Sequence, residues 1–226
     1  MDVALEQVSL GAPGGTAVVA EMQENGKGRL NRNWISPAGG VYVSIVLYPQ
    51  TQLVNSLTMI ASLAVCDCIR ETSGVEAKIK WPNDILLGGE KVGGILACSG
   101  TSPSQGAYAV VGIGINADLD LDKYPEIAGI AASLAGASGK NVSRRELLCS
   151  LLGNLEKRYD RLSAGESQIG EWRAALVTIG QPVTVKTGGL TFTGTAESVD
   201  CDGSLLLRLE HGGYKIVPAG DVTLRA

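Results

Sequence analysis

The chain has a single histidine, His211. A Ser-His-Asp or Cys-His catalytic group would have to use it, but the surrounding His211-Gly212-Gly213 predicts an exposed turn. The sequence also contains no Gly-x4-Gly-Lys-Ser/Thr motif, which excludes a P-loop nucleotide enzyme. Gly112-Ile113-Gly114 lacks the third glycine of a dinucleotide fingerprint. Any chemistry here must therefore come from other groups.

Long apolar runs and excess positive charge are also missing. No run approaches the length needed to cross a membrane, and the acidic start lacks the basic end and apolar core of a signal peptide. The net charge of -4 argues against a nucleic-acid partner. The five cysteines are an odd number, and Cys66-x-Cys68 has no second pair for a zinc site. We interpret all five as reduced core thiols of a cytoplasmic protein.

The apolar periodicity predicts strands and helices in alternation over the first three quarters of the chain. Gly74 is expected to end the main early helix, and Ser143-x-x-Glu146 is a capping box that begins a later one. The expected helices are residues 4–10, 52–71, one from Ser143 onward and a short one before residue 176. The expected strands are residues 16–22, 41–48, 76–81, 85–87, 91–97 and 108–115.

Beyond Gly180 the pattern changes to five short strands separated by glycine-rich turns, which suggests a small barrel. The expected strands are residues 183–186, 190–198, 204–209, 214–217 and 222–224. Cations and anions are almost balanced in this part of the chain, so it offers no patch for a nucleic acid. The sequence therefore predicts two domains, residues 1–178 and 179–226.

A basic, glycine-containing loop lies between the first two expected strands. In Gly26-Lys27-Gly28-Arg29, the glycines let successive N–H groups point at one ligand, and the cations attract an anion. Arg32 follows, and Trp34 ends the loop. Trp34 is interpreted either as a stacking partner for a base or as a core aromatic. The alternative for the whole loop is a mobile, solvated hairpin.

The block Lys80-Trp81-Pro82-Asn83-Asp84 is the second unusual stretch. Pro82 ends a strand, so the following turn should project the Asp84 carboxylate beside Lys80. Lys91 then begins a returning strand that contains Gly93 and Gly94. This hairpin could face a ligand with its polar end, or it could be structural, with Lys80–Asp84 and Glu90–Lys91 ion pairs.

Taken together, these segments resemble the biotin protein ligases, which activate biotin with ATP and attach it to a lysine of a carrier protein. The basic loop and the Lys80–Asp84 block are highly specific for that family, and the strand ending in Asn116 adds support. The resemblance covers nearly the whole chain. It implies an α+β fold: a class II synthetase-like biotin/lipoate ligase catalytic domain, with a mixed or antiparallel sheet and helices, followed by a small SH3-like β-barrel.

The resemblance also assigns site residues, position by position. It implies catalytic roles for Lys91, Arg29 and Asp84, with Asp84 also reaching Mg²⁺ through the phosphates. The implied biotin contacts are Gln23, Lys27, Gly28, Arg29, Lys91, Gly94, Leu96, Gly112 and Gly114. The implied ATP contacts are Gly26, Arg32, Trp34, Lys80, Asn83 and Asn116.

ATP and Mg²⁺ are the implied co-substrate and activator, with biotin as substrate and no tightly bound prosthetic group. The implied partners are a biotin carboxyl carrier protein and a second copy of the chain, with no nucleic acid or membrane. The family's Ser-Thr-Asn motif before the first helix has no counterpart here, so we expect either that the sequence is truncated at its start or that the site makes fewer hydrogen bonds to the biotin ring. Only 22 residues precede Gln23, so no N-terminal winged helix is expected.

Three alternatives remain open at this point. A lipoate ligase of the same superfamily differs in substrate and not in fold. A non-catalytic protein that binds biotin or a nucleotide is compatible with the missing N-terminal motif. A structural, β-rich interaction protein leaves the clustered cations unexplained.

Overall fold

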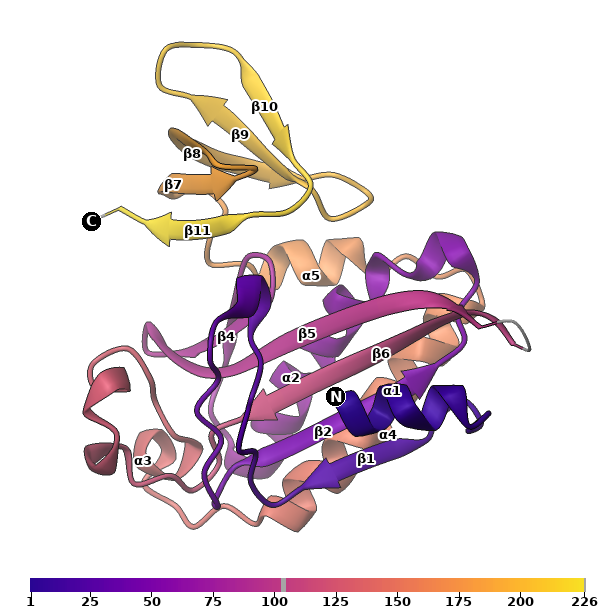
Figure 1. The fold of residues 1–226 in the computed structure, drawn as a ribbon. Coiled ribbons are helices and arrows are strands. Elements are labelled where there is room, and N and C mark those ends of the chain that lie inside the picture. The colour runs from indigo at the N-terminus through magenta and orange to yellow at the C-terminus, as the bar shows by residue number, and fades with distance from the viewer. Residues whose placement is uncertain (103–104, 226) are drawn as a thin grey trace.

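Two antiparallel sheets organise the computed structural model, which describes residues 1–102 and 105–225 (Figure 1). The larger sheet has the order β1-β2-β6-β5-β4-β3. Its strands are β1 (Ala17–Ala20), β2 (Val41–Leu47), β3 (Lys78–Lys80), β4 (Asp84–Leu87), β5 (Glu90–Ser102) and β6 (Gly106–Ile115). The helices are α1 (Asp2–Ser9), α2 (Ser56–Ser73), α3 (Leu134–Ser138), α4 (Arg144–Ser163) and α5 (Ile169–Ala175).

The main core lies between one face of the larger sheet and helices α2 and α4, which Figure 1 shows behind it. Successive strand residues point to opposite faces, and on β2 and β6 Val43, Ile45 and Ile113 point to these helices. Gly74, in the left-handed conformation with φ 77°, ends α2 as expected. Ser143 caps α4, and its hydroxyl accepts a hydrogen bond from the Glu146 amide.

The opposite face of the sheet is only partly covered. Helix α1 packs Ala4 and Val8 against Val46 and Val110, forming a small second cluster. Further along the same face the sheet carries glycines, and none of the helices in the described residues covers it there. The loop between β1 and β2 crosses this uncovered part, as Figure 1 shows in front of the sheet. The fold therefore leaves room for a ligand between α1 and this loop.

The C-terminal strands form a five-stranded sheet with the order β10-β9-β8-β7-β11. They are β7 (Pro182–Thr187), β8 (Leu190–Val199), β9 (Leu205–Leu209), β10 (Tyr214–Val217) and β11 (Asp221–Leu224). All five expected strands are confirmed, but β10 and β11 form the two ends of the described sheet, so closure into a barrel stays a prediction. The Trp81 indole donates to the Gly203 carbonyl oxygen at 2.9 Å and joins this sheet to the larger one.

The sequence patterns did not predict α3 or four single-turn 3₁₀ helices: Arg29–Asn31, Thr51–Leu53, Leu121–Lys123 and Pro125–Ile127. Such short turns carry no apolar period that sequence analysis could detect. β5 also runs five residues beyond its expected end at residue 97, because β6 pairs with it along its whole length. His211 lies in an exposed turn, as expected. Within the described ranges, no helix is long and apolar enough to cross a membrane.

All five cysteines are free, as expected, but Cys149 and Cys201 are exposed, so the expected core position was wrong for these two. Cys68 is fully buried in α2, and Cys66, two residues earlier in the same helix, is half-buried. Burial raises the pKa of the Cys66 thiol to about 12 and that of Cys68 even further. Both thiols therefore stay protonated at neutral pH and act as core residues.

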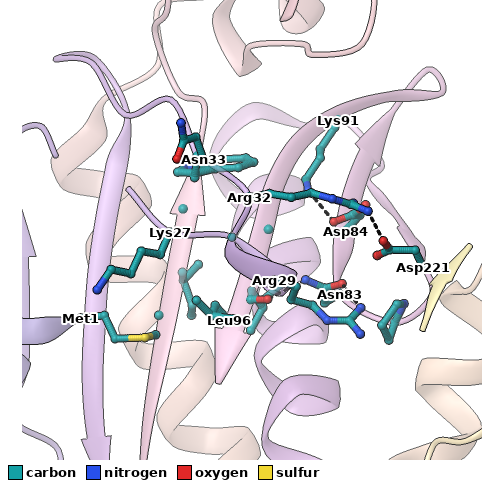
Figure 2. Close-up of a pocket in the computed structure, with 18 of the residues that line it drawn as sticks. Met1, Lys27, Arg29, Arg32, Asn33, Asn83, Asp84, Lys91, Leu96 and Asp221 are labelled. Carbon is teal, nitrogen blue, oxygen red and sulfur yellow. Dashed lines mark hydrogen bonds and ion pairs between the residues drawn. The ribbon is translucent and has the colours of Figure 1, made fainter. Parts of the chain in front are cut away.

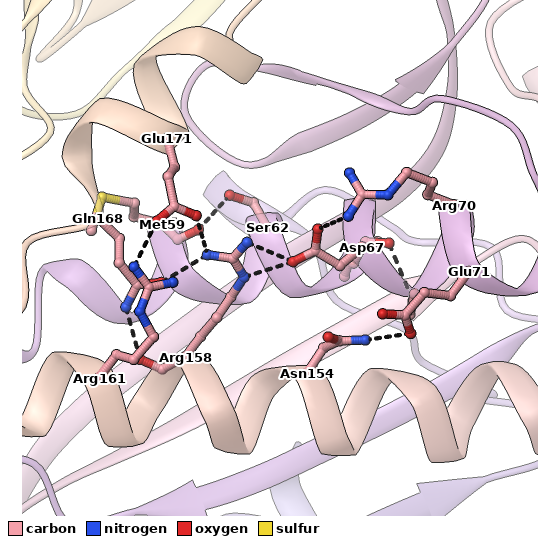
Figure 3. A network of polar contacts seen from close by, with 12 residues as sticks. Met59, Ser62, Asp67, Arg70, Glu71, Asn154, Arg158, Arg161, Gln168 and Glu171 are labelled. Carbon is pink, nitrogen blue, oxygen red and sulfur yellow. Dashed lines mark hydrogen bonds and ion pairs between the residues drawn. The ribbon is translucent and has the colours of Figure 1, made fainter.

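A polar network joins α2, α4 and α5 on the helical side (Figure 3). Arg158 of α4 places two nitrogens on one Asp67 carboxylate oxygen, at 2.5 and 2.8 Å, and also bonds Gln168 at 2.7 Å. The Trp172 indole donates to the Ser62 hydroxyl at 3.0 Å. The network holds α5, which leads directly into the C-terminal sheet.

The burial of this network predicts a specific cost. Arg158 and Asp67 are 11% and 15% exposed, so Arg158→Ala leaves a nearly buried carboxylate with fewer partners. We expect this variant to lose about 3 kcal/mol of unfolding free energy. Arg161→Ala is the control, because Arg161 is 42% exposed and its pairs contribute within about 1 kcal/mol. Urea titration measures both; equal losses would contradict a special role for Arg158.

Candidate active site

A cavity of about 350 Å³ opens between the uncovered face of the larger sheet, the β1–β2 loop and the C-terminal sheet (Figure 2). Three acidic and six cationic side chains line it, although the chain as a whole carries a charge of -4. The acids are Asp2, Asp84 and Asp221, and the cations are Lys27, Arg29, Arg32, Lys80, Lys91 and Lys186. This concentration of positive charge suits an anionic ligand.

Glycines form the floor of the cavity. Gly94 of β5 and Gly114 of β6 are directly paired, and Gly112 lies two residues along on the same face. A side chain at any of the three would fill the space: a Cβ on Gly112 would come within 2.7 Å of the Met1 methyl carbon. The sheet therefore exposes bare backbone where its neighbours carry side chains.

Trp34 lies over this glycine floor. A Cβ on Gly114 would come within 2.7 Å of the indole Nε1, and one on Gly94 would lie 3.8 Å from the same ring. The Lys91 ammonium lies 5.0 Å from the ring centroid, within cation–π range. Among the described residues, the buried indole Nε1 has no hydrogen-bond partner. A buried donor without a partner is costly, so a ligand acceptor beside it would gain affinity.

The basic loop is ordered by its own backbone. The Trp34 amide donates to the Gly26 carbonyl at 2.8 Å, and the Gly28 amide donates to the Arg32 carbonyl at 2.7 Å. Gly26 is required here because a Cβ would collide with the Trp34 carbonyl oxygen. Leu30, at the tip, has φ 54°, a left-handed conformation that is rare for a branched side chain. The loop is therefore a built element and not a solvated hairpin.

Arg29 extends from this loop into the wall of the cavity. Its Nη1 donates to the Asn83 side-chain oxygen at 3.1 Å and to the Gly220 carbonyl at 3.2 Å. Burial lowers the pKa of Arg29, and Asp221 and Asp84 oppose that effect. A guanidinium remains protonated at neutral pH in any case. Arg29 thus presents a partly desolvated positive charge, where electrostatic interactions are strong.

The β4–β5 hairpin supplies the facing wall. Asn83 is held in place because its amide donates to the Ile95 carbonyl at 2.7 Å. The Lys91 ammonium lies 2.5 Å from an Asp84 oxygen, and both side chains are about a quarter to a third exposed. The Lys91 backbone is also pinned, since its amide donates to the Ile130 carbonyl at 2.9 Å. The ion pair thus joins Asp84 to Lys91, and among the described residues neither ion pair of the structural alternative, Lys80–Asp84 or Glu90–Lys91, is formed.

Comparisons with known proteins identify this architecture. Residues 2–116 match the biotin/lipoate A/B protein ligase family, and residues 178–225 match the biotin protein ligase C-terminal domain. The biotin–[acetyl-CoA-carboxylase] ligase of Paracoccus denitrificans is 34% identical over 94% of this chain and 91% of its own length. The chain belongs to the biotin protein ligase family.

Other relatives agree with this membership. The bifunctional ligase/repressor BirA of Bacillus spizizenii is 38% identical over 92% of this chain, which spans 66% of that protein's length. The solved structure of the Aquifex aeolicus biotin protein ligase in complex with biotin and ATP has a TM-score of 0.82 and 29% identity. That match covers 94% of this chain and 90% of the other.

The cavity contains nearly all the residues that the family resemblance had singled out. Those lining it are Gln23, Lys27, Gly28, Arg29, Arg32, Trp34, Lys80, Asn83, Asp84, Lys91, Gly94, Leu96, Gly112 and Gly114. Two expected residues lie outside the lining. Gly26 acts through the loop backbone, and Asn116 is buried, with its amide donating to the Ala132 carbonyl at 3.0 Å. Asn116 thus braces the segment behind Lys91.

Sequence analysis missed several lining residues. Met1 and Asp2 come from α1, Ser44 from β2, and Lys186 and Asp221 from the C-terminal sheet. None of them belongs to a recognisable motif. The alternation along β2 could have placed Ser44 on the glycine face, but nothing in the sequence indicates that β7 and β11 reach the cavity.

The contact between Trp34 and Gly114 gives a direct test of the floor. Gly114→Ala should push the indole off the sheet, because its Cβ would lie 2.7 Å from the Trp34 Nε1. Acrylamide quenching of tryptophan fluorescence should increase, since Trp81 and Trp172 remain buried. Gly153→Ala in α4 meets nothing within 4 Å and is the matched control. Unchanged quenching in Gly114→Ala would mean that Trp34 does not depend on this glycine.

Proposed function

We propose that this chain makes biotinyl-5′-AMP from biotin and ATP and transfers the biotin to a lysine of a biotin carboxyl carrier protein. One observation carries the proposal: the glycine-floored cavity gathers six cations against three acids in a protein of net negative charge. The Aquifex aeolicus relative, which shares this fold along nearly the whole chain, is described with biotin and ATP bound.

The reaction has two steps. A carboxylate oxygen of biotin attacks the α-phosphorus of ATP, the bond to the β-phosphate breaks, and pyrophosphate leaves. The ε-amine of the carrier lysine then attacks the acyl carbon, AMP leaves, and the amine loses a proton to solvent. Neither step needs a protein nucleophile, which agrees with a chain whose single histidine lies in a distant exposed turn.

The protein's task is to position two anions and to stabilise the charge that develops on the α-phosphate. Lys91 and Arg29 are the cations we assign to this task, because they approach the cavity from facing walls. One preorganised donor of this kind contributes about 2.7–4 kcal/mol to the transition state. Trp34, over the glycine floor, is assigned to the adenine and the adjoining part of biotin.

Mg²⁺ bound to nucleotide phosphates needs only one or two protein carboxylates. Asp84 fits that requirement and would hold the ion through the phosphates; the bound ion would supply positive charge that offsets the charge of the pyrophosphate. Within the described residues, no group of three or more His, Cys, Asp or Glu side chains is arranged to hold a metal ion. The donor set thus suits an ion that arrives with ATP.

Four finer features belong to the same proposal. We place the boundary between catalytic and C-terminal domains at residues 178 and 179, close to where the second family match begins. We propose that the C-terminal sheet curls as an SH3-like barrel, that the protein forms a homodimer, and that it acts in the cytoplasm. The free, partly buried cysteines support that location.

Mass spectrometry tests the function directly. The purified protein is incubated with Mg-ATP and either biotin or lipoate, and the retained adenylate is measured together with released pyrophosphate. We expect biotinyl-AMP and pyrophosphate only when biotin is present. Lipoyl-AMP would favour the lipoate ligase, and binding without pyrophosphate release would favour a non-catalytic protein.

Replacing Lys91 should affect chemistry more than folding. Lys91→Ala removes a donor from both reacting anions and should lower the rate of adenylate formation by about a hundredfold or more. The melting temperature should change little, because the Lys91–Asp84 pair is partly exposed. Lys215→Ala, which removes a cation over Phe192 on the C-terminal sheet, is the control. A large loss of stability with near-normal turnover would instead support a structural hairpin.

Arg29 should retain the intermediate. Arg29→Gly removes the link between the loop, Asn83 and Gly220, so the loop should open and release the adenylate. Adenylate synthesis should remain measurable, while unrelated proteins added to the reaction should acquire biotin on their lysines. Streptavidin blotting of an added bystander protein measures this labelling. A variant that loses activity without such labelling would show that Arg29 does not retain the intermediate.

A further inference from the structure

Carboxylates of the protein already pair with three of the six cations of the cavity. Lys27 pairs with Asp2 of α1 at 2.8 Å, Lys91 with Asp84 of β4 at 2.5 Å, and Arg32 with Asp221 of β11. Figure 2 shows Arg32 and Lys91 converging from different sides, with Asp84 and Asp221 at their tips. An incoming phosphate therefore has to compete with carboxylates of the protein itself.

In the Arg32–Asp221 pair, the aspartate is held in place and the arginine is the more exposed partner. Its backbone pairs with Lys186 of β7, and the preceding turn is fixed because the Thr187 hydroxyl donates to the Ala219 carbonyl at 2.6 Å. The Asp221 side chain is 22% exposed, whereas that of Arg32 is 65% exposed. The sheet thus fixes the carboxylate, and the arginine is the partner that is free to move.

The same turn also holds the other arginine of the loop. The Gly220 carbonyl accepts from Arg29 at 3.2 Å, so two successive residues of the C-terminal sheet contact the basic loop. In the described part of the chain, these are the hydrogen bonds and the ion pair that join the loop to that sheet. These contacts join segments about 190 positions apart in the sequence.

We propose that Asp221 is a positioning residue: it occupies the place on Arg32 that a ligand phosphate takes, and so holds the basic loop closed before the nucleotide arrives. Phosphate then displaces the carboxylate. A partly exposed ion pair is weak, and a terminal phosphate group carries more negative charge than a single carboxylate, so the exchange is favourable. The identification of the phosphate with the pyrophosphate end of ATP rests on the proposed function.

Inorganic pyrophosphate is the probe for this exchange. Asp221→Asn keeps the size of the side chain and removes the competing charge, so pyrophosphate should bind about two- to fivefold more tightly, the scale of one partly exposed ion pair. Titration calorimetry at fixed ionic strength measures this affinity. Glu210→Gln is the matched control, because Glu210 pairs with Arg225 in the C-terminal domain and lies outside the cavity lining. The affinity of this variant for pyrophosphate should equal that of the wild type.

Trypsin reports on the loop itself, because Lys27, Arg29 and Arg32 are cleavage points within it. Asp221→Asn should be cut there several-fold faster than the wild type and the Glu210→Gln variant, and pyrophosphate should restore protection. In an Arg32→Gln background, Asp221→Asn should produce no further gain in pyrophosphate affinity, since the two residues then act as one unit.

Three results would overturn the proposal: weaker pyrophosphate binding in Asp221→Asn, a gain that persists without Arg32, or loop cleavage equal to that of Glu210→Gln. If Asp221→Asn changes the melting temperature but neither the pyrophosphate affinity nor the rate of loop cleavage, the Arg32–Asp221 pair has a purely structural role and the proposal is wrong. The pyrophosphate assay needs no biotin. A protein that shows the exchange but forms no biotinyl-AMP would refute the proposed function and leave this inference standing.

Discussion

The site depends on one stretch of the larger sheet where backbone replaces side chains. Gly94, Gly112 and Gly114 leave one face bare, while the opposite face of the same strands packs on α2 and α4. The helical core makes these strands rigid, and the missing side chains let Trp34 and a ligand approach the backbone. A single methyl group at Gly114 would already displace the indole, so packing alone specifies the glycine at that position.

Charge is arranged around this floor in pairs that are compensated but weak. A cluster of bare cations would repel itself and open the loop, whereas strong buried pairs could not exchange with a ligand. The pairs of Lys27, Arg32 and Lys91 are all partly exposed. They therefore keep the loop ordered and still leave its cations available to phosphate. Arg158, in contrast, is nearly buried and joins α4 to α2 through Asp67.

The C-terminal sheet is part of the site as well as a neighbour of it. The Trp81 indole donates to the Gly203 carbonyl oxygen, and the Gly220–Asp221 turn contacts two arginines of the basic loop. The sheet is therefore attached both to the Lys80–Asp84 block and to the loop. α5 reaches the same sheet, because Arg173 donates to the Val199 carbonyl at 2.7 Å. A change in the position of this sheet would thus move Asp221 and Arg32 together.

Much of this could be predicted from the sequence, because local chemistry decides it. The period of α2, the cap at Ser143 and the glycine-rich turns each specify an element within a few residues. The basic loop and the Lys80–Asp84 block identify the wall residues by their motifs. Helix α3, which lies before Ser143, was not predicted, because it is only five residues long.

Other features required the tertiary structure, because they join residues far apart in the chain. Asp84 pairs with Lys91 and not with Lys80, and the Asn116 side chain lies outside the cavity lining and bonds the Ala132 carbonyl oxygen. Asp221 reached Arg32 across most of the sequence. No local pattern encodes such pairs: they arise when two sheets pack and opposite charges come within contact distance. The motifs therefore determined which groups line the cavity, and the packing of the two sheets decided which of them pair.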